Sequence, residues 1–349
     1  MKKYNFSAGP SILDPQVVRE TIENIDNSNK LSLIELSHRG PEIQKLFADT
    51  KALVKEMLHL DDRFEVLFLH GGASLQNCMI PYNIRTKGIA AYTDTGIWAH
   101  KAIEESSIIR ETKVVASSKD ANYSFLPSIG DWDEEGYLHL TSNNTVHGTQ
   151  YHSFPKLRKA SLLVDMSSDI LSRKVDYNQF SLIYAGLQKN LGTAGGCLVI
   201  VDKNILEEEY RLPKMLDYKE HIKAESMVNT PPVFAVLMCN IVLRWIAANG
   251  GVEEMEKRSI QKARLLYDEI DRNPLIEGFV REEDRSLINA SFKTSSPSLE
   301  TELLNYLKTK GIEGIDGHRS KGGFRASMYN MMPVSHVEYL VDCLQKFSK

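Results

Sequence analysis

Short apolar runs alternate with helical stretches from about residue 16 to residue 250, and this alternation constrains the fold more than any other feature of the chain. The run FEVLFLHGG leads into the helical stretch ASLQNCMIPYNI, and GIAAYTDTG leads into IWAHKAIEES. Further strands are expected at KVVAS, YLHLTS, SLLVDMSS, SLIYAGLQ and CLVIVD. Strands that alternate with helices predict an α/β fold, in which a mostly parallel sheet is flanked by helices.

The pattern changes near residue 251, where i, i+3, i+4 apolar spacing predicts a long helix over residues 251–272. The strands LIEGFV and LINASFKT follow, then the helix PSLETELLNYLKTKG, the strand GGFRASMYN and a closing helix at about 333–347. We therefore expect a large domain at residues 16–250 and a smaller C-terminal α+β domain at residues 251–349. Residues 1–15 are expected to form an N-terminal segment that packs with the small domain.

Composition excludes several classes of function. The formal net charge is -4 and no basic run is present, so a nucleic-acid partner is not expected. The first residues, MKKYNFSAGPSILDPQ, lack the apolar core of a signal peptide. Asn240 and Arg244 interrupt the longest apolar stretch, so it predicts a buried helix and not a membrane span. Four widely spaced cysteines without a CxxC motif argue against disulfides and a zinc site and fit the cytoplasm.

Polar residues follow several predicted strands at their carboxyl ends, where open parallel sheets bind ligands. In LHGGASLQ, two glycines precede a helix whose first N–H groups could bind an anion, although a tight turn explains them equally well. Asp165 ends one strand, and taken alone it is most simply a helix cap. Trp98 follows another strand, and taken alone it would be a core aromatic. Lys189 lies in a glycine-rich turn about one crossover and one strand after Asp165.

Taken together, these four features suit a pyridoxal phosphate site. A lysine amine forms a Schiff base with the cofactor aldehyde, and an aspartate keeps the pyridine nitrogen protonated. A glycine-rich helix start binds the phosphate, and an aromatic side chain stacks on the ring. Each feature is weak alone, but their joint order along the chain favours this chemistry.

The dipeptide His-Arg occurs twice, as His38-Arg39 and as His318-Arg319, and Arg325 opens a short apolar strand nearby. Arginine binds carboxylate and phosphate groups through paired hydrogen bonds. A single arginine is usually a solvated surface charge, but two His-Arg pairs among glycine turns favour an anion pocket. A substrate that carries both a carboxylate and a phosphate would use all of these residues.

Longer motifs occur along essentially the whole chain. They are FSAGPSILD, SHRG, LHGGASLQ, TDTGIWA, NNTVHGT, DMSSDILSR, YAGLQKNLG, VNTPPVFA and GHRSKGGFRASMYN. These motifs resemble those of the phosphoserine aminotransferase family, within the class V aminotransferases of the type I pyridoxal-phosphate fold. The resemblance implies transfer of an amino group from L-glutamate to 3-phosphohydroxypyruvate, giving O-phospho-L-serine and 2-oxoglutarate in serine biosynthesis. The resemblance also makes the phosphohydroxythreonine step of pyridoxine biosynthesis a second candidate reaction. The residues do not decide whether the enzyme catalyses it.

The resemblance implies a role for each matching position around the cofactor. Lys189 would bind the aldehyde and carry the proton to and from the substrate Cα, and Asp165 would pair with the pyridine nitrogen. Trp98 would stack on the ring, with Thr145 near its hydroxyl. The family often has an arginine where this chain has Ala73-Ser74, so the Ser74 hydroxyl and backbone N–H groups would bind the phosphate here. The complete implied cofactor set is Ala73, Ser74, Trp98, Thr145, Asp165, Gln188, Lys189, Asn229 and Thr230.

The resemblance also implies an obligate homodimer with pyridoxal 5'-phosphate at the subunit interface. Asn229 and Thr230 would reach the cofactor phosphate of the neighbouring subunit. Arg325 would bind the substrate α-carboxylate. The rest of the anion pocket, partly from across the interface, would be His38, Arg39, His318 and Arg319.

Three other readings remain. One is another class V enzyme, such as a small-substrate aminotransferase or a cysteine desulfurase. A desulfurase would need a reactive cysteine in a mobile loop, whereas Cys343 falls in a helical apolar pattern. A nucleotide-binding protein would carry GxxxxGK[ST] or GxGxxG, and the chain has neither. An inactive regulatory homologue would have lost Lys189 or Asp165, and both are present.

Overall fold

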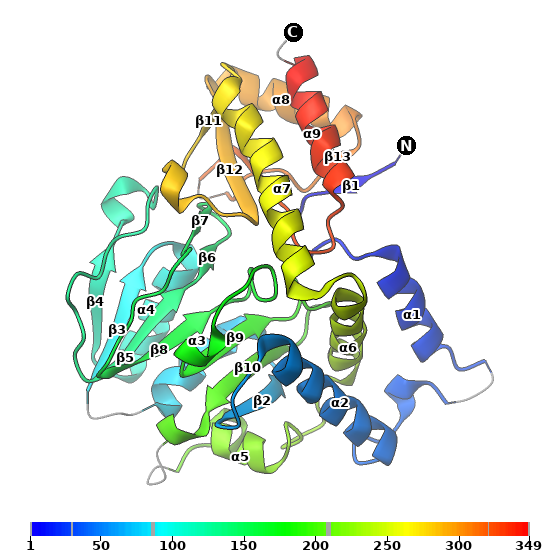
Figure 1. Cartoon of the computed structure of the whole chain (residues 1–349), viewed down its shortest axis with the longest axis vertical. Coiled ribbons are helices and arrows are strands. Elements are labelled where there is room, and N and C mark those ends of the chain that lie inside the picture. Colours follow the sequence, from blue (N-terminus) through cyan, green and yellow to red (C-terminus); the bar gives the residue numbers. More distant parts are fainter. Residues whose placement is uncertain (1, 29–30, 85–87, 207–210, 320, 348–349) are drawn as a thin grey trace.

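A seven-stranded sheet forms the centre of the protein in the computed structural model, which describes residues 2–28, 31–84, 88–206, 211–319 and 321–347 (Figure 1). The strand order is β2-β10-β9-β8-β5-β3-β4. β10 runs antiparallel to both of its neighbours, and the other four pairs are parallel. The expected α/β fold with a mostly parallel sheet is therefore confirmed. The strands are β2 (Phe64–Leu69), β3 (Ile89–Asp94), β4 (Thr112–Ser117), β5 (Gly136–Thr141), β8 (Ala160–Asp165), β9 (Leu182–Gly186) and β10 (Cys197–Asp202).

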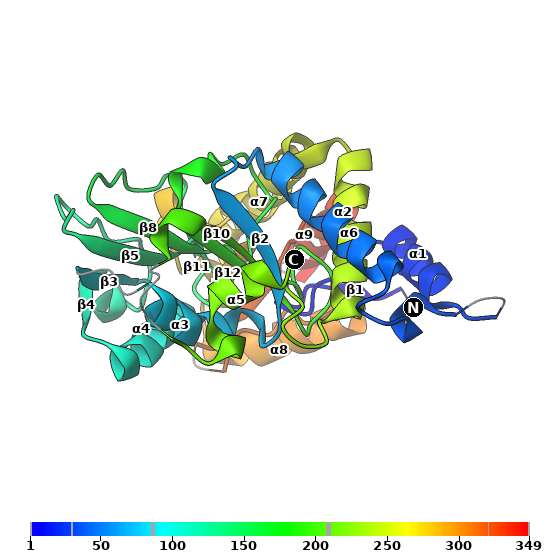
Figure 2. The same ribbon diagram turned by 90° about the horizontal axis from the view of Figure 1, so that it is seen from below.

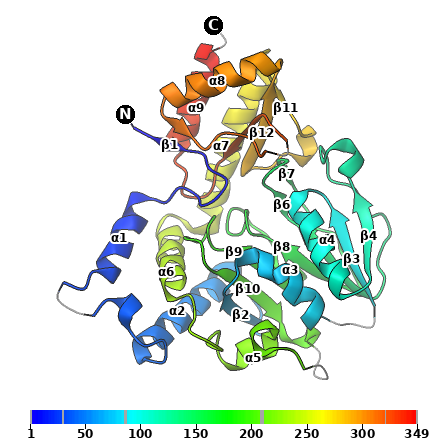
Figure 3. The ribbon, with the colours of Figure 1, turned by 180° about the vertical axis from the view of Figure 1, so that it is seen from behind.

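Both faces of this sheet are covered by helices, and the alternation of side chains along each strand divides the core in two. In β2, Val66 and Phe68 belong to one hydrophobic cluster, while Leu67 and Leu69 belong to another. The first cluster is shared with α1 (Pro15–Ile25), α2 (Pro41–Leu58) and α6 (Val233–Ala248). The second is shared with α3 (Gly72–Asn83), α4 (Ile97–Ile109) and α5 (Tyr218–Lys223), and Figures 2 and 3 show these two groups of helices on opposite faces.

The C-terminal part of the chain has a hydrophobic cluster of its own. It packs α7 (Gly251–Arg272), α8 (Pro297–Thr309) and α9 (Val334–Phe347) around an antiparallel sheet of order β11-β12-β14. These strands are β11 (Ile276–Gly278), β12 (Asn289–Thr294) and β14 (Phe324–Ser327). Phe6 lies in the same cluster, and β1 (Tyr4–Asn5) pairs in parallel with β13 (Ile312–Glu313). The domain boundaries given above stay a prediction.

The remaining elements are short. A β-hairpin is formed by β6 (Asn143–Asn144) and β7 (Thr149–Gln150). The 3-10 helices are η1 (Leu33–Glu35), η2 (Lys119–Ala121), η3 (Tyr177–Gln179), η4 (Lys203–Ile205), η5 (Lys214–Leu216) and η6 (Glu282–Asp284). Over the described ranges no single helix is long and apolar enough to cross a membrane. α6 and α7 would suffice only together, and they are bent by 83° at the break between them.

Candidate active site

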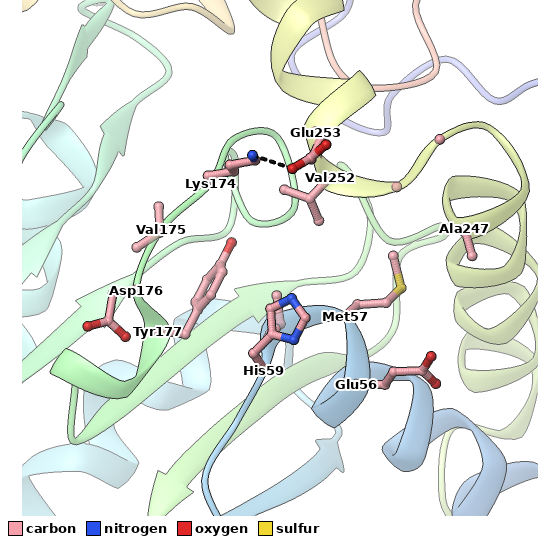
Figure 4. A pocket seen from close by; sticks show the side chains of 13 residues that line it. Glu56, Met57, His59, Lys174, Val175, Asp176, Tyr177, Ala247, Val252 and Glu253 are labelled. Atoms are coloured by element: carbon pink, nitrogen blue, oxygen red, sulfur yellow. Dashed lines mark ion pairs between the residues drawn. The ribbon is translucent and has the colours of Figure 1, made fainter.

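A cavity of about 710 Å³ lies at the carboxyl ends of β8 and β9, and residues of both the large sheet and the C-terminal cluster line it. Nine of the side chains expected at the site face this cavity: Ala73, Ser74, Trp98, Thr145, Asp165, Gln188, Lys189, His318 and Arg325. A second cavity, of about 720 Å³, is lined by the end of α2, residues 174–177 and the α6–α7 junction (Figure 4). It holds the Lys174–Glu253 ion pair and none of the expected residues. The two cavities therefore have similar volumes, and they differ in that only the first contains residues expected at the active site.

Lys189 and Asp165 lie at the ends of neighbouring strands. β8 and β9 pair in parallel with Asp165 opposite Tyr184, and Lys189 follows the end of β9. Burial lowers the pKa of Lys189, while the carboxylates of Asp165 and Asp169 raise it. Burial raises the pKa of Asp165, and the nearby charge of Lys189 lowers it. Burial and the neighbouring charge therefore act in opposite directions on the pKa of each group. Such shifted pKa values are typical of functional sites.

The Lys189 side chain is packed from outside the sheet by the N-terminal segment. Gly9 has a φ of +152°, and a Cβ added there would lie 3.7 Å from the Lys189 Cγ. Lys189 Nζ makes no hydrogen bond or ion pair with any residue that the structure describes. An amine that is partly buried, has no hydrogen-bond partner and lines a cavity is suited to bind a ligand rather than to stabilise the fold.

One end of the cavity is formed by the first turn of α3. Its N-cap is Gly71, with a φ of +82°, and no side chain of the described chain caps the helix. The first N–H groups of the helix are therefore available to a ligand, and the helix dipole favours an anion there. Ala73, Ser74 and Gln188 line this end.

A tryptophan and a threonine form a wall of the cavity. Trp98 lies in the first turn of α4, and its Nε1 donates a hydrogen bond to the Thr145 Oγ1 at 3.0 Å. This bond fixes the orientation of the indole ring, which is the condition for stacking on a flat ligand.

The part of the cavity that Arg325 and His318 line is basic. Arg325 projects from β14, and its buried Nε has no hydrogen-bond partner among the described residues. Burial lowers the pKa of Arg325. Burial also lowers the pKa of His318, and the positive charge of Arg325 adds to this effect. A partly buried guanidinium whose buried Nε has no hydrogen-bond partner is suited to a carboxylate or phosphate ligand.

Five of the expected residues do not line the cavity of this chain. His38 and Arg39 lie in the turn between η1 and α2, and Arg319 is exposed beside His318. Asn229 and Thr230 are exposed in the loop before α6, where the Thr230 carbonyl lies 2.8 Å from the His70 Nε2.

Some cavity residues were not expected from the sequence. They are Ala8, Gly9, Pro10, Thr141, Asn143, Ser167, Ser168, Ala194 and Gly195, whereas Gly71 and Gly72, which also line the cavity, are the two glycines expected before the helix. Ser167 and Ser168 follow Asp165 by two and three residues, and Asn143 comes two residues before Thr145. Their places in the sequence next to expected residues could have identified them.

Comparisons with known proteins agree with this geometry. The family model described as "Aminotransferase class-V" matches residues 3–340. A curated phosphoserine aminotransferase of Parabacteroides distasonis is 47% identical over 100% of this chain and 99% of its own. The solved phosphoserine aminotransferase of Bacillus circulans subsp. alkalophilus is 42% identical, with a TM-score of 0.96 over 99% of this chain and 98% of its own. A PLP-bound phosphoserine aminotransferase of Trichomonas vaginalis is 31% identical, with a TM-score of 0.92 over 99% and 100% of the two chains.

Proposed function

Because the chain belongs to the class V aminotransferases, and within them to the phosphoserine aminotransferase family, we propose that it transfers the amino group of L-glutamate to 3-phosphohydroxypyruvate. The products would be O-phospho-L-serine and 2-oxoglutarate, and the reaction is reversible. The observation that carries the proposal is the single cavity in which Lys189, Asp165 and Arg325 face one another.

The residues of this cavity fit pyridoxal 5'-phosphate as the cofactor. Lys189 offers a partly buried amine without a hydrogen-bond partner in the described chain, and Asp165 offers a partly buried carboxylate whose charge acts on that amine. The uncapped first turn of α3 suits the cofactor phosphate, with Ala73, Ser74 and Gln188 around it. When bound, pyridoxal phosphate supplies an electron sink that stabilises negative charge at the substrate Cα.

Each side chain then has a distinct task. The Lys189 Nζ would carry the proton to and from the substrate Cα, because burial lowers its pKa and lets it exist as the free base more readily than an exposed lysine does. The Asp165 carboxylate would hold a proton on the pyridine nitrogen of the cofactor. Trp98, oriented by its hydrogen bond to Thr145, would stack on the cofactor ring. Arg325 binds the α-carboxylate, which orients the Cα–H bond toward Lys189.

Both substrates carry two anionic groups that must be bound. L-glutamate carries an α-carboxylate and a side-chain carboxylate, and 3-phosphohydroxypyruvate carries a carboxylate and a phosphate. Both anionic groups lie at a similar distance from the reacting carbon, so one basic pocket can accept the two in turn. His318 lies beside Arg325 at this end of the cavity, and Arg319 adjoins it in the sequence.

The active enzyme is proposed to be a homodimer. His38, Arg39, Asn229 and Thr230 lie outside the cavity of their own chain, so they could complete the site of a partner subunit. Exposed apolar side chains on and near α1 and α6 support an interface there: Val18, Ile22, Leu31, Ile34 and Phe234. The four free cysteines suit a reducing compartment, so we place the enzyme in the cytoplasm.

A coupled assay tests the substrate. The purified protein, loaded with pyridoxal phosphate, is given L-glutamate with either 3-phosphohydroxypyruvate or unphosphorylated hydroxypyruvate, and formation of 2-oxoglutarate is followed. We expect kcat/KM to be at least about a hundredfold higher for the phosphorylated acid, because its phosphate would make charge-assisted hydrogen bonds in the basic pocket. A third reaction uses the ketoacid of the phosphohydroxythreonine step in place of 3-phosphohydroxypyruvate, and it measures whether the enzyme also accepts that substrate. Equal rates with and without the phosphate would refute the proposal.

A further inference from the structure

Lys262 of α7 is fully buried. Its Nζ donates hydrogen bonds to the Met328 carbonyl at 2.8 Å and to the Tyr329 carbonyl at 2.7 Å. It forms no ion pair with any acidic residue in the described ranges. Burial of a lysine without a carboxylate partner lowers the free energy of unfolding, so we expect this lysine to serve a function that offsets the loss.

The two carbonyls belong to the segment that directly follows β14, the strand that carries Arg325. Each residue of this segment, Met328 to Asn330, makes a contact with a different part of the protein. The Met328 N–H donates to the Ile288 carbonyl at 2.7 Å. The Tyr329 hydroxyl donates to the Ala8 carbonyl at 2.5 Å. The Asn330 N–H donates to the Asn190 Oδ1 at 3.1 Å.

These contacts lead to both sides of Lys189. On one side, the N-terminal segment that contains Ala8 continues to Ser11, whose N–H and Oγ donate to the carbonyls of Gln188 and Lys189. On the other side, Asn190 adjoins Lys189, and its Nδ2 donates to the carbonyl of Ile170 at 3.0 Å. The backbone of Lys189 is therefore held from two directions, and both routes pass through residues 328–330.

We propose that Lys262 is a positioning residue for amino transfer: by holding residues 328–330 it fixes Arg325 and Lys189 relative to one another. This inference rests on the proposed function. Lys262 touches no substrate and does not line the cavity. α7 packs in the C-terminal cluster and continues to its junction with α6 (Figure 1). Its Lys262 holds the segment whose Tyr329 and Asn330 make the bonds toward Lys189.

The geometry explains why a lysine occupies this position. Both carbonyls are buried acceptors that lie next to each other along one backbone, and a single Nζ reaches both. Burial lowers the pKa of Lys262 to about 7. An ammonium and a neutral amine both carry at least two N–H donors, so both bonds persist in either state. Methionine has similar length and no donor, and it would leave both carbonyls without a partner.

The test compares Lys262→Met and Tyr329→Phe with a control, Lys257→Met, in the full-length enzyme loaded with pyridoxal phosphate. Lys257 is an exposed lysine on the same helix. Tyr329→Phe removes only the hydroxyl that donates to Ala8, so it tests one route even if Lys262→Met does not fold. Three quantities are measured: thermal midpoint, kcat and KM for both substrates, and the pH midpoint of the visible absorbance of the cofactor bound to Lys189.

We expect Lys262→Met to lower kcat/KM by about tenfold to a hundredfold, since displacements of about 1 Å have effects of this size. We also expect it to shift the pH midpoint of the absorbance, because that midpoint depends on the surroundings of Lys189. Tyr329→Phe should shift it in the same direction by less, and the double variant should match Lys262→Met instead of adding to it. Lys257→Met should behave as wild type.

Two outcomes separate the hypotheses. If Lys262→Met and Tyr329→Phe change only the thermal midpoint, with kcat/KM and the pH midpoint as in Lys257→Met, then Lys262 is merely structural and the inference is wrong. If wild-type protein binds the cofactor at Lys189 but does not transfer the amino group to 3-phosphohydroxypyruvate, the proposed substrate is wrong. The absorbance measurements then decide the inference alone: shifted midpoints in the two variants support it, and unshifted midpoints overturn it.

Discussion

The protein should lose stability in mild acid partly through one histidine that lies far inside the fold. His139 of β5 is 1% exposed, and its ring lies 4.9 Å from the Tyr92 ring and 5.8 Å from the Tyr184 ring, centroid to centroid. Its Nε2 lies 3.0 Å from the Tyr184 hydroxyl, and its Nδ1 has no partner among the described residues. Burial lowers the pKa of His139 from 6.5 to about 3.

The sign and the size of the effect follow from this shift. Between pH 6.5 and pH 3 the unfolded chain binds a proton at this position and the folded chain does not. The contribution of His139 to stability is therefore fully present above pH 6.5 and is lost as the pH falls toward 3. Each pH unit in this window costs about 1.4 kcal/mol, so at pH 5 the wild type has lost about 2 kcal/mol through this group.

The variant His139→Phe isolates the effect, because phenylalanine fits the same aromatic cluster and does not titrate. At pH 7.5 we expect it to lower the free energy of unfolding by about 1 kcal/mol, through loss of the bond to Tyr184. Tyr184 retains its bond to the Asn77 Oδ1 at 3.2 Å. At pH 5 the variant should be about 1 kcal/mol more stable than wild type, because only the wild type has lost about 2 kcal/mol through His139.

Urea unfolding at pH 7.5 and pH 5 measures the free energies. The other histidines are common to both proteins, so their titration cancels in the difference. Tyr92→Phe, a change in the same cluster that removes no group titrating in this range, should follow the pH dependence of wild type. If wild type and His139→Phe lose the same free energy between the two pH values, the assigned pKa is wrong.

Two further predictions concern the cavity. Purified protein should absorb at about 400 nm through the cofactor bound to Lys189. Lys189→Ala should abolish both this absorbance band and the bond to the cofactor that borohydride can trap. A trapped bond in the variant would contradict the assignment of Lys189. Arg325→Ala should raise KM for both substrates and lower kcat/KM by the equivalent of about 2–4 kcal/mol, because it removes one partner of a desolvated ion pair. An unchanged kcat/KM would exclude Arg325 from carboxylate binding.

The class of fold was predictable because period and length of the apolar runs are set by strand geometry. The antiparallel direction of β10 relative to its neighbours could not be predicted from the sequence. A strand buried on both faces has a continuous apolar sequence whichever way it runs, and CLVIVD is buried at every position. Only the length of the connection at residues 187–196 carries the information, since a parallel crossover needs a dozen or more residues.

The site was predictable where a residue type is uncommon at a strand end. A lysine and an aspartate after apolar strands stand out, whereas Ser167, Ser168 and Asn143 resemble the small polar residues that follow most strands. Lys262 could not be identified, because the sequence of α7 contains several lysines and arginines and does not show which one is buried. Its burial depends on the segment at residues 328–330, which comes from a distant part of the sequence.

The pairing of the chain's first strand with β13 determines when during synthesis the active site can form. Residues 4–8 leave the ribosome long before three of the residues that hold them, Ile312, Glu313 and Tyr329. Ser11 can meet its partners Gln188 and Lys189 earlier, but the rest of the N-terminal segment must wait until the C-terminal cluster is synthesised. The large sheet could fold during that interval, yet the lysine beside it would acquire its complete surroundings only after β13 and β14 emerge.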